Sequence, residues 1–206
     1  MRSIDEVSDQ VRDNVRNAVP GAFLWACRLH DVKLTRFALI VSVSRQQLSL
    51  FELRRTATQA RHYRLRARYV ASTSRFGVGQ QSGSNRTPLG LHRVAEKIGA
   101  GHPVGTVFES RRPVGFTWQG RPDGAIAHRI LWLDGLEAGV NRGGSVDSRA
   151  RYIYIHGLGD EPTLGRPASR GCVHLAAADL MPLFDRVPCG TLVWIGLHGG
   201  PPALPL

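Results

Sequence analysis

Hydrophobic residues recur every fourth position near the start of the chain, as they do on one face of a helix. Ser3 and Glu6 fit a capping box at the beginning of such a helix, and Pro20-Gly21 ends the pattern. The hydrophobic positions are Val7, Val11, Val15 and Val19. We therefore predict a short amphipathic helix that packs against the rest of the chain.

From residue 37 onward the pattern changes to that of β-strands. Residues 38–43 and 48–53 are hydrophobic and partly β-branched, and the four polar residues between them predict a hairpin. Residues 62–70 alternate with a period of two, which predicts a strand with arginines on one face. Those arginines are Arg64, Arg66 and Arg68, opposite Tyr63, Leu65, Ala67 and Tyr69.

Further hydrophobic runs predict strands at residues 105–109, 127–133, 151–155 and 190–195. Residues 179–187 predict a short helix, in which Pro182 is tolerated only near the first turn. Residues 71–88 are rich in Gly, Ser, Asn and Gln and predict a long loop of the kind that often carries function. The predicted class is mostly β with a few short helices.

Length and composition agree with one ordinary domain and a short appendage. The chain has 206 residues, of which 42% are hydrophobic and 21% charged, and this excludes wholesale disorder. No stretch approaches 18 consecutive apolar residues, so a membrane-spanning helix is not expected. No secretory signal is visible in the polar first 20 residues. There is no repeat and no inter-domain linker.

The charge is strongly positive, and arginine supplies almost all of it. The formal net charge is +11, from 27 basic and 16 acidic residues, and only Lys33 and Lys97 are lysines. Six arginines fall between Arg54 and Arg68. They indicate either an anionic polymer as a partner or simply a solvated basic face. Because the predicted strand places them on one face rather than on a flexible tail, nucleic acid is the less favoured partner.

The segment richest in reactive side chains runs from residue 153 to residue 174. His156 ends a predicted strand, and Cys172 follows Gly171 directly. An imidazole could hold the cysteine as a nucleophile, and a preceding glycine lets backbone N–H groups turn toward an oxyanion. With His174, the same residues offer three zinc-type ligands, although the Cys-x-His spacing is unusual. A buried, inert thiol is the third interpretation, since free cysteine is among the most buried residue types.

The same segment resembles the signature of the L,D-transpeptidase catalytic domain (YkuD type). That signature reads His-Gly, a loop, and then Ser-His-Gly-Cys-hydrophobic-Arg. Here it stands as His156-Gly157, a loop containing Gly165-Arg166-Pro167-Ala168, and then Ser169-Arg170-Gly171-Cys172-Val173-His174. Thr87-Pro88-Leu89-Gly90 is similar to the Thr-Pro-x-Gly hallmark of the family. The resemblance covers about residues 37–197.

The resemblance implies a fold and a role for each matching residue. The fold is a β-sandwich or barrel over residues 35–198, with a helical extension at 1–34 and a Pro/Gly-rich tail at 199–206. Cys172 is then the nucleophile and His156 its general base, oriented by the carbonyl of Gly157. Backbone N–H groups near Gly171 and Cys172 form the oxyanion hole. Substrate contacts fall to Ser169, Arg170 and His174.

The implied reaction is acyl transfer on peptidoglycan stem peptides, without a cofactor or a metal. The thiolate attacks the carbonyl of the diamino acid at position three, D-alanine leaves, and an amine resolves the thioester. Water as acceptor would make the enzyme an L,D-carboxypeptidase. The resemblance implies a periplasmic or envelope location, where the arginine face would suit an anionic wall polymer. The alternative outside enzymology is a non-catalytic module that binds wall polymer or nucleic acid through that face.

Two residues depart from the family signature. Arg170 replaces the histidine two positions before the cysteine, and a guanidinium cannot act as a base although its charge can lower a thiol pKa. His174 replaces the arginine two positions after the cysteine, and it can act as a cation only when protonated. Both changes leave the pair of Cys172 and His156 intact and put the acceptor and the substrate contacts in question.

Overall fold

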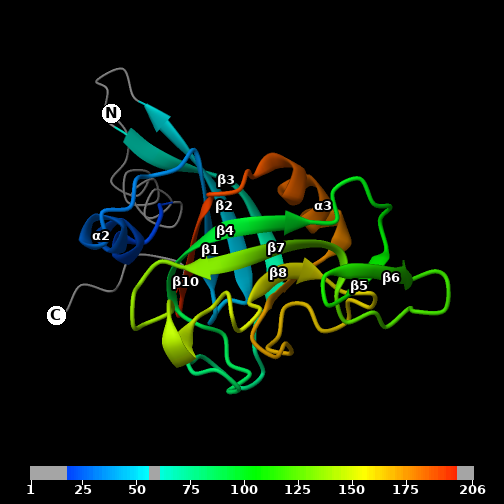
Figure 1. The fold of residues 1–206 in the computed structure, drawn as a ribbon. Helices are drawn as coiled ribbons and strands as arrows, with labels where there is room; N and C mark the ends of the chain where they lie inside the picture. Colours follow the sequence, from blue (N-terminus) through cyan, green and yellow to red (C-terminus); the bar gives the residue numbers. More distant parts are fainter. Residues whose placement is uncertain (1–17, 56–60, 199–206) are drawn as a thin grey trace, which may run out of the picture.

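The computed structural model describes residues 18–55 and 61–198. Nearly all of the helix predicted for residues 3–19 lies outside the described residues, as does the tail at 199–206. Labels follow Figure 1. The described elements are α2 (Gly21–Leu29), β1 (Phe37–Ser42), β2 (Gln47–Arg55), β3 (Arg61–Ser72), β4 (Gly90–Ile98), β5 (Thr106–Glu109), β6 (Arg112–Phe116), β7 (Ala127–Gly135), the 3-10 turn η1 (Gly144–Val146), β8 (Tyr154–Gly157), β9 (Val173–Leu175), α3 (Ala177–Arg186) and β10 (Leu192–Gly196).

The strands form one sheet that closes on itself. Within the described residues the sheet has ten strands in the order β4-β10-β1-β2-β3-β9-β8-β7-β5-β6, and β4 also pairs with β7. That extra pairing closes the sheet into a barrel, and the β5–β6 hairpin extends from β7 beyond it (Figure 1). Two of the neighbouring pairs are parallel, β1 with β10 and β8 with β9. The predicted mostly-β, barrel-like class is confirmed.

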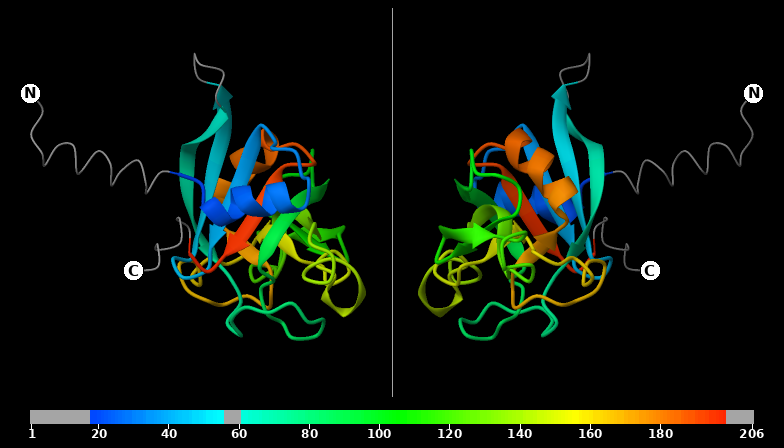
Figure 2. Two further views of the ribbon diagram at one scale, coloured as in Figure 1. Left: turned by 90° about the vertical axis from the view of Figure 1, so that its left-hand side faces the viewer. Right: turned by 90° about the vertical axis from the view of Figure 1, so that its right-hand side faces the viewer.

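Strand β1 is buried on both faces and separates two hydrophobic clusters. Leu39 and Val41 belong to the cluster that fills the barrel, which also contains Phe184 of α3. The alternate residues Ala38 and Ile40 pack outward against α2, chiefly against Phe23 and its neighbours. Helices α2 and α3 accordingly lie on opposite sides of the barrel (Figure 2). Because side chains alternate along a strand, one hydrophobic run satisfies both layers.

The predicted strands near the N-terminal half agree with the structure. β1 and β2 form an antiparallel hairpin, from Phe37 opposite Glu52 to Ser42 opposite Gln47. In β3, Tyr63 is buried while the arginines at alternate positions are exposed. The alternation predicted for residues 62–70 is therefore confirmed.

The strand predicted at residues 151–155 is displaced toward the C-terminus. Residues 148–152 form a turn in which Tyr152 has a φ of 56°, and β8 begins only at Tyr154. A left-handed backbone conformation cannot continue a strand, so the hydrophobic run starts before the strand does. Pro182 also differs from expectation, because α3 begins at Ala177 and places the proline in its second turn.

No sequence pattern predicted α2, β4, β6 or β9. Pro20 does not only end a pattern, since it also stands at the N-cap of α2, and a rigid φ suits that position. The stretch that became α2 is short, and β9 has only three residues. Such short elements depend on packing rather than on a periodic signal.

A buried histidine of β4 makes the stability of the fold depend on pH. His92 of β4 is fully buried, its Nδ1 lies 3.0 Å from the carbonyl of Gly90, and its Nε2 lies 3.0 Å from Oγ of Ser148. Desolvation lowers the pKa of His92 to about 4, below its ordinary value of 6.5. The unfolded chain therefore takes up a proton between these two values that the folded chain does not.

We expect the free energy of unfolding to fall as the pH drops from 6.5 toward 4, by up to roughly 3 kcal/mol through His92. Urea unfolding at pH 7.5 and 4.5 measures this difference. His92→Gln should be less stable at pH 7.5 and should show a smaller difference, whereas His62→Gln, at an exposed position, should keep the wild-type difference. If His92→Gln loses as much unfolding free energy between pH 7.5 and 4.5 as the wild type does, His92 is not the source of the pH dependence.

Candidate active site

The predicted site residues meet on one face of the parallel β8–β9 pair. Register places His156 opposite His174 and Ile155 opposite Val173. Ile155 and Val173 point into the barrel cluster, so His156 and His174 point the other way. Their rings are 4.7 Å apart, and Cys172 comes directly before β9. Cys172 and His156 are thus diagonal neighbours across two adjacent strands.

His156 is held as a neutral base. Its Nδ1 lies 2.8 Å from the carbonyl oxygen of Gly157, which only accepts, so Nδ1 carries the proton and Nε2 is left as the acceptor. The ring is 3% exposed, and desolvation lowers the pKa of His156 to about 4. The contact with Gly157 is the one that the resemblance implies, while its catalytic role stays a prediction.

Cys172 is held as a neutral thiol. Its sulfur donates a 3.5 Å hydrogen bond to the carbonyl of Tyr152 and packs against the cluster of Phe108, Ile130 and Tyr154. Desolvation raises the pKa of Cys172 to about 11, although the backbone N–H of Tyr154 and the charge of Arg151 act in the opposite direction. With His156 at low pKa, the resting pair is thiol and imidazole rather than thiolate and imidazolium.

The loop before Cys172 is fixed from inside by Ser169. This residue is 2% exposed, its Oγ donates to the carbonyl of Cys172 at 2.6 Å, and it accepts the N–H of Gly171 at 3.2 Å. Gly171 has a φ of 121°, and a Cβ there would lie 3.3 Å from the carbonyl oxygen of Arg86. Glycine is therefore required to bring Cys172 out of this loop. Direct substrate contact by Ser169 stays a prediction.

The two residues that depart from the family signature differ in their surroundings. Arg170 is exposed to solvent. His174 is partly buried, and its Nδ1 has no hydrogen-bond partner among the described residues. Desolvation, together with the neighbouring His156, lowers the pKa of His174 to about 3. His174 is thus neutral near pH 7 and does not supply the cation that an arginine would.

Two residues that the sequence analysis did not assign hold the site in place. The guanidinium of Arg151 donates to the carbonyls of Gly79, Gln80 and Arg86, and so fastens the loop of residues 73–89 beside Cys172. His128 accepts the N–H of Gly105 and lies 2.8 Å from the carbonyl of Leu158, just past the strand of His156. No local signal marks either residue, because each acts on a segment distant in sequence.

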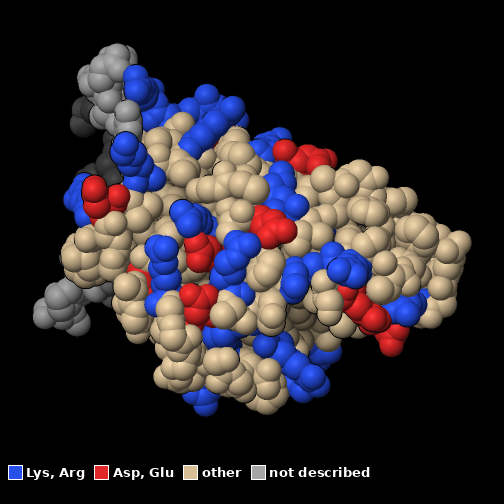
Figure 3. Space-filling view, viewed as in Figure 1, with Lys and Arg blue, Asp and Glu red and all other residues tan. Residues whose placement is uncertain are grey.

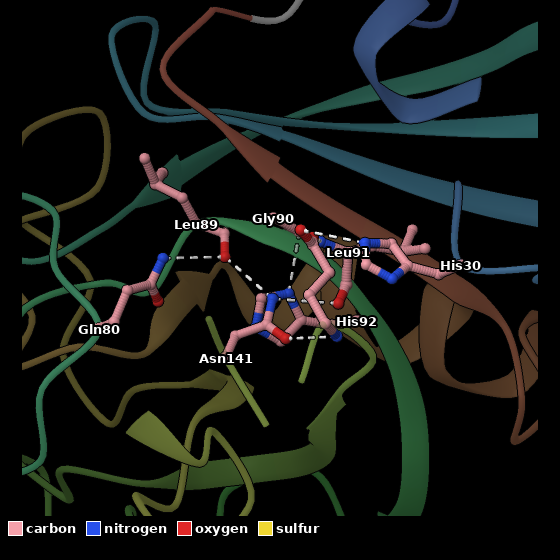
Figure 4. Close-up of polar contacts among 8 residues, drawn as sticks. His30, Gln80, Leu89, Gly90, Leu91, His92 and Asn141 are labelled. Carbon is pink, nitrogen blue, oxygen red and sulfur yellow. Dashed lines mark hydrogen bonds and ion pairs between the residues drawn. The ribbon is translucent and has the colours of Figure 1, made fainter. Parts of the chain in front are cut away.

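The Thr87–Gly90 motif forms a second anchor of the same loop. Thr87 is fully buried and its hydroxyl accepts the N–H of Ser74 at 3.0 Å. Figure 4 shows the carbonyl of Leu89 between the side-chain amides of Gln80 and Asn141, which donate at 3.3 and 3.0 Å. A cavity of 380 Å³ lies against Leu89 and Trp194, but none of the predicted site residues lines it. The motif therefore positions the loop.

The side chains of His156, Cys172 and His174 do not form a recognisable metal site in the structure. Within residues 18–55 and 61–198, no group of three or more His, Cys, Asp or Glu side chains is arranged to hold a metal ion. All three cysteines are unpaired, with Cys27 buried and Cys189 exposed. Cys172 lies on the same face as two imidazoles, and whether it acts as a nucleophile or is an inert thiol stays a prediction.

The arginine face is partly neutralised by a single carboxylate. Glu52 is 5% exposed and pairs with Arg54, Arg66 and Arg36 at 2.8, 3.1 and 3.3 Å. Desolvation favours the neutral carboxyl, but the three guanidinium groups outweigh it and hold the pKa of Glu52 below its ordinary value. Basic side chains gather near the described end of the β2–β3 hairpin, whereas over β4 and β7, in the middle of the view, basic and acidic side chains alternate (Figure 3).

The thiol state of Cys172 predicts the pH dependence of its alkylation. In Cys189→Ser protein, iodoacetamide should modify Cys172 slowly at pH 7, and the rate should rise about tenfold per pH unit up to pH 10, because only the thiolate reacts. Peptide mass mapping separates this reaction from that of Cys27, and Cys172→Ala shows the background. A rate that levels off below pH 8 would show a preformed thiolate instead.

Comparison with known proteins gives the family and the fold. The profile of the L,D-transpeptidase catalytic domain, YkuD, matches residues 36–195. Bd1075 of Bdellovibrio bacteriovorus superposes with a TM-score of 0.50 at 18% identity, over 89% of this chain and 53% of that one. An L,D-transpeptidase of Xylanimonas cellulosilytica gives 0.44 at 18% identity, over 80% and 62%. The helical cell shape determining protein Pgp2 of Campylobacter jejuni gives 0.48 at 14%, over 81% and 48%.

The family profile matches most of the chain, whereas the chain covers only part of each solved structure. No curated protein matches the chain. The chain spans about half to three fifths of the length of these solved structures. Among the described residues, no helix is long and apolar enough to cross a membrane. Since the family profile extends over most of the chain and includes Thr87–Gly90, His156 and Cys172, the chain belongs to the L,D-transpeptidase catalytic domain (YkuD) family.

Proposed function

We propose that this protein is a peptidoglycan L,D-transpeptidase that uses Cys172 as its nucleophile. The observation that carries the proposal is the fixed tautomer of His156, which leaves Nε2 as an unprotonated base on the same sheet face as the thiol. The family supports the substrate class, a stem peptide of peptidoglycan. An envelope location follows from that substrate.

The chemistry begins with a neutral pair. As the sulfur of Cys172 attacks the carbonyl carbon of the diamino acid at position three, the thiol proton passes to Nε2 of His156. The backbone N–H of Cys172 then faces the developing oxyanion, as the resemblance implies. When the tetrahedral intermediate collapses, the C–N bond breaks, and His156 returns its proton to the leaving amine of D-alanine.

The thioester that remains is resolved by a second nucleophile. An amine from another stem peptide gives a cross-link and regenerates the thiol. Water gives a trimmed stem, which is the L,D-carboxypeptidase reaction and the second candidate. His174 is neutral near pH 7, so it does not provide a cation next to His156 that could select the acceptor. The arginine face, where Arg64 and Arg66 are exposed, would contact an anionic wall polymer.

The acyl-enzyme is the test of this function. Incubation with a tetrapeptide-stem muropeptide should add the mass of the donor minus D-alanine to the intact protein. Cys172→Ala should show no adduct, and His156→Gln should form it about 10²–10⁴-fold more slowly, since the general base is lost. Cys189→Ser removes an exposed thiol elsewhere and should react as the wild type does.

Addition of an acceptor stem then distinguishes the two candidates. A cross-linked dimer identifies the transpeptidase, and a trimmed monomer alone identifies the carboxypeptidase. An adduct that persists in Cys172→Ala, or a wild-type protein that never acylates, would refute the proposed mechanism.

A further inference from the structure

One cation beside the active site is clasped by aromatic rings. The guanidinium of Arg111 lies 4.7 Å from the ring centre of Trp132 and 5.1 Å from that of Tyr152. It also donates a 3.3 Å hydrogen bond to the hydroxyl of Tyr154. Contacts of this kind hold a guanidinium against aromatic rings, and its remaining N–H groups can still donate to a planar anion.

The backbone is strained at two of the residues that form this contact, which we call the Arg111 clasp (Arg111, Trp132, Tyr152 and Tyr154). Arg111 has a φ of 68° and follows Ser110 at 47°, in the two-residue turn between β5 and β6. Such turns favour Gly and Asn, which adopt positive φ easily. Tyr152 also has a φ of 56°, although it is bulky. Non-Gly residues with such backbone conformations cluster at active sites and ligand-binding segments.

The clasp lies next to the nucleophile. Cys172 donates to the carbonyl of Tyr152, the same residue whose ring covers Arg111. Tyr154, which accepts the hydrogen bond from Arg111, belongs to the cluster against which Cys172 packs. An anion on Arg111 would therefore be bound within the site that holds the thiol.

Arg111 differs from the neighbouring cations in having no carboxylate partner among the described residues. Glu109 pairs with Arg121 at 2.5 Å, and Arg149, which also contacts the ring of Trp132, pairs with Glu96 at 3.0 Å. The guanidinium of Arg151 is already used by three backbone carbonyls. Of these four cations, Arg111 is the one that pairs with neither a carboxylate nor a backbone carbonyl among the described residues.

We propose that Arg111 is a specificity-determining residue that binds the C-terminal carboxylate of the donor peptide. This inference rests on the proposed function, in which D-alanine leaves from the C-terminal side of the scissile carbonyl. The carboxylate of that residue is one residue away from the carbon that Cys172 attacks. A charge-assisted hydrogen bond from the Arg111 guanidinium then selects donors that end in a free carboxylate.

The test compares two donors and two variants. The donors are the tetrapeptide stem with a free C-terminal carboxylate and the same peptide as a C-terminal amide. Arg111→Gln should raise the KM of acylation for the free acid roughly tenfold to a hundredfold, with a smaller effect on kcat. Amidation of the donor should raise the KM of the wild type by a similar factor. It should raise the KM of Arg111→Gln little further. Arg112→Gln, an exposed arginine in the same hairpin, loses the same charge and should behave as the wild type.

Two readouts keep this inference separate from the proposed function. Alkylation of Cys172 by neutral iodoacetamide should be unchanged in Arg111→Gln, which shows an intact thiol site. In Cys172→Ala protein, quenching of tryptophan fluorescence by the free-acid peptide measures binding without turnover, and Arg111→Gln should weaken it. Normal acylation with equal discrimination between acid and amide in wild type and Arg111→Gln would overturn the role of Arg111 alone. Failure of the wild type to acylate, with Arg111-dependent binding intact, would overturn only the reaction.

Discussion

The parallel pairing of β8 and β9 is the interaction on which the rest of the site depends. It brings together two segments separated by a long loop and sets His156 opposite His174, with Cys172 directly before the shorter strand. Parallel strands need a crossover, and here residues 158–172 provide it as a loop fixed by Ser169 and Gly171. The barrel strands on either side of this pair, β3 and β7, fix its register, so barrel closure determines how His156 and His174 are placed.

Burial explains the unusual charge states in the site. A hydrophobic environment disfavours the charged form of every group, so the thiol of Cys172 is raised in pKa and both imidazoles are lowered. In the proposed mechanism, a neutral pair needs proton transfer during the attack, which couples reactivity to a correctly placed substrate. The same burial would oppose binding of a charged peptide. A cation stacked on aromatic rings offsets that cost at the edge of the site.

The sequence predicted the elements whose signals are local. The β1–β2 hairpin and the arginine row of β3 follow from runs and alternation over a few residues, and the segment from His156 to Cys172 follows from a short motif. Other features depend on contacts between distant segments. Arg151 binds the carbonyl of Gly79, 72 positions away, and no pattern around Arg151 indicates that contact. The turn at Tyr152 displaced a predicted strand because a hydrophobic run does not reveal a positive φ.

One electrostatic argument relates His174 to the strained turn between β5 and β6. At His174 a permanent cation would lie directly against His156 and, by repulsion, would lower the basicity of that imidazole further. A neutral ring avoids this penalty but leaves no charge there to receive a carboxylate. A guanidinium on a separate hairpin can receive it at a greater distance from the base. The left-handed backbone at Ser110 and Arg111 is then the conformational cost of placing that cation against Trp132 and Tyr152.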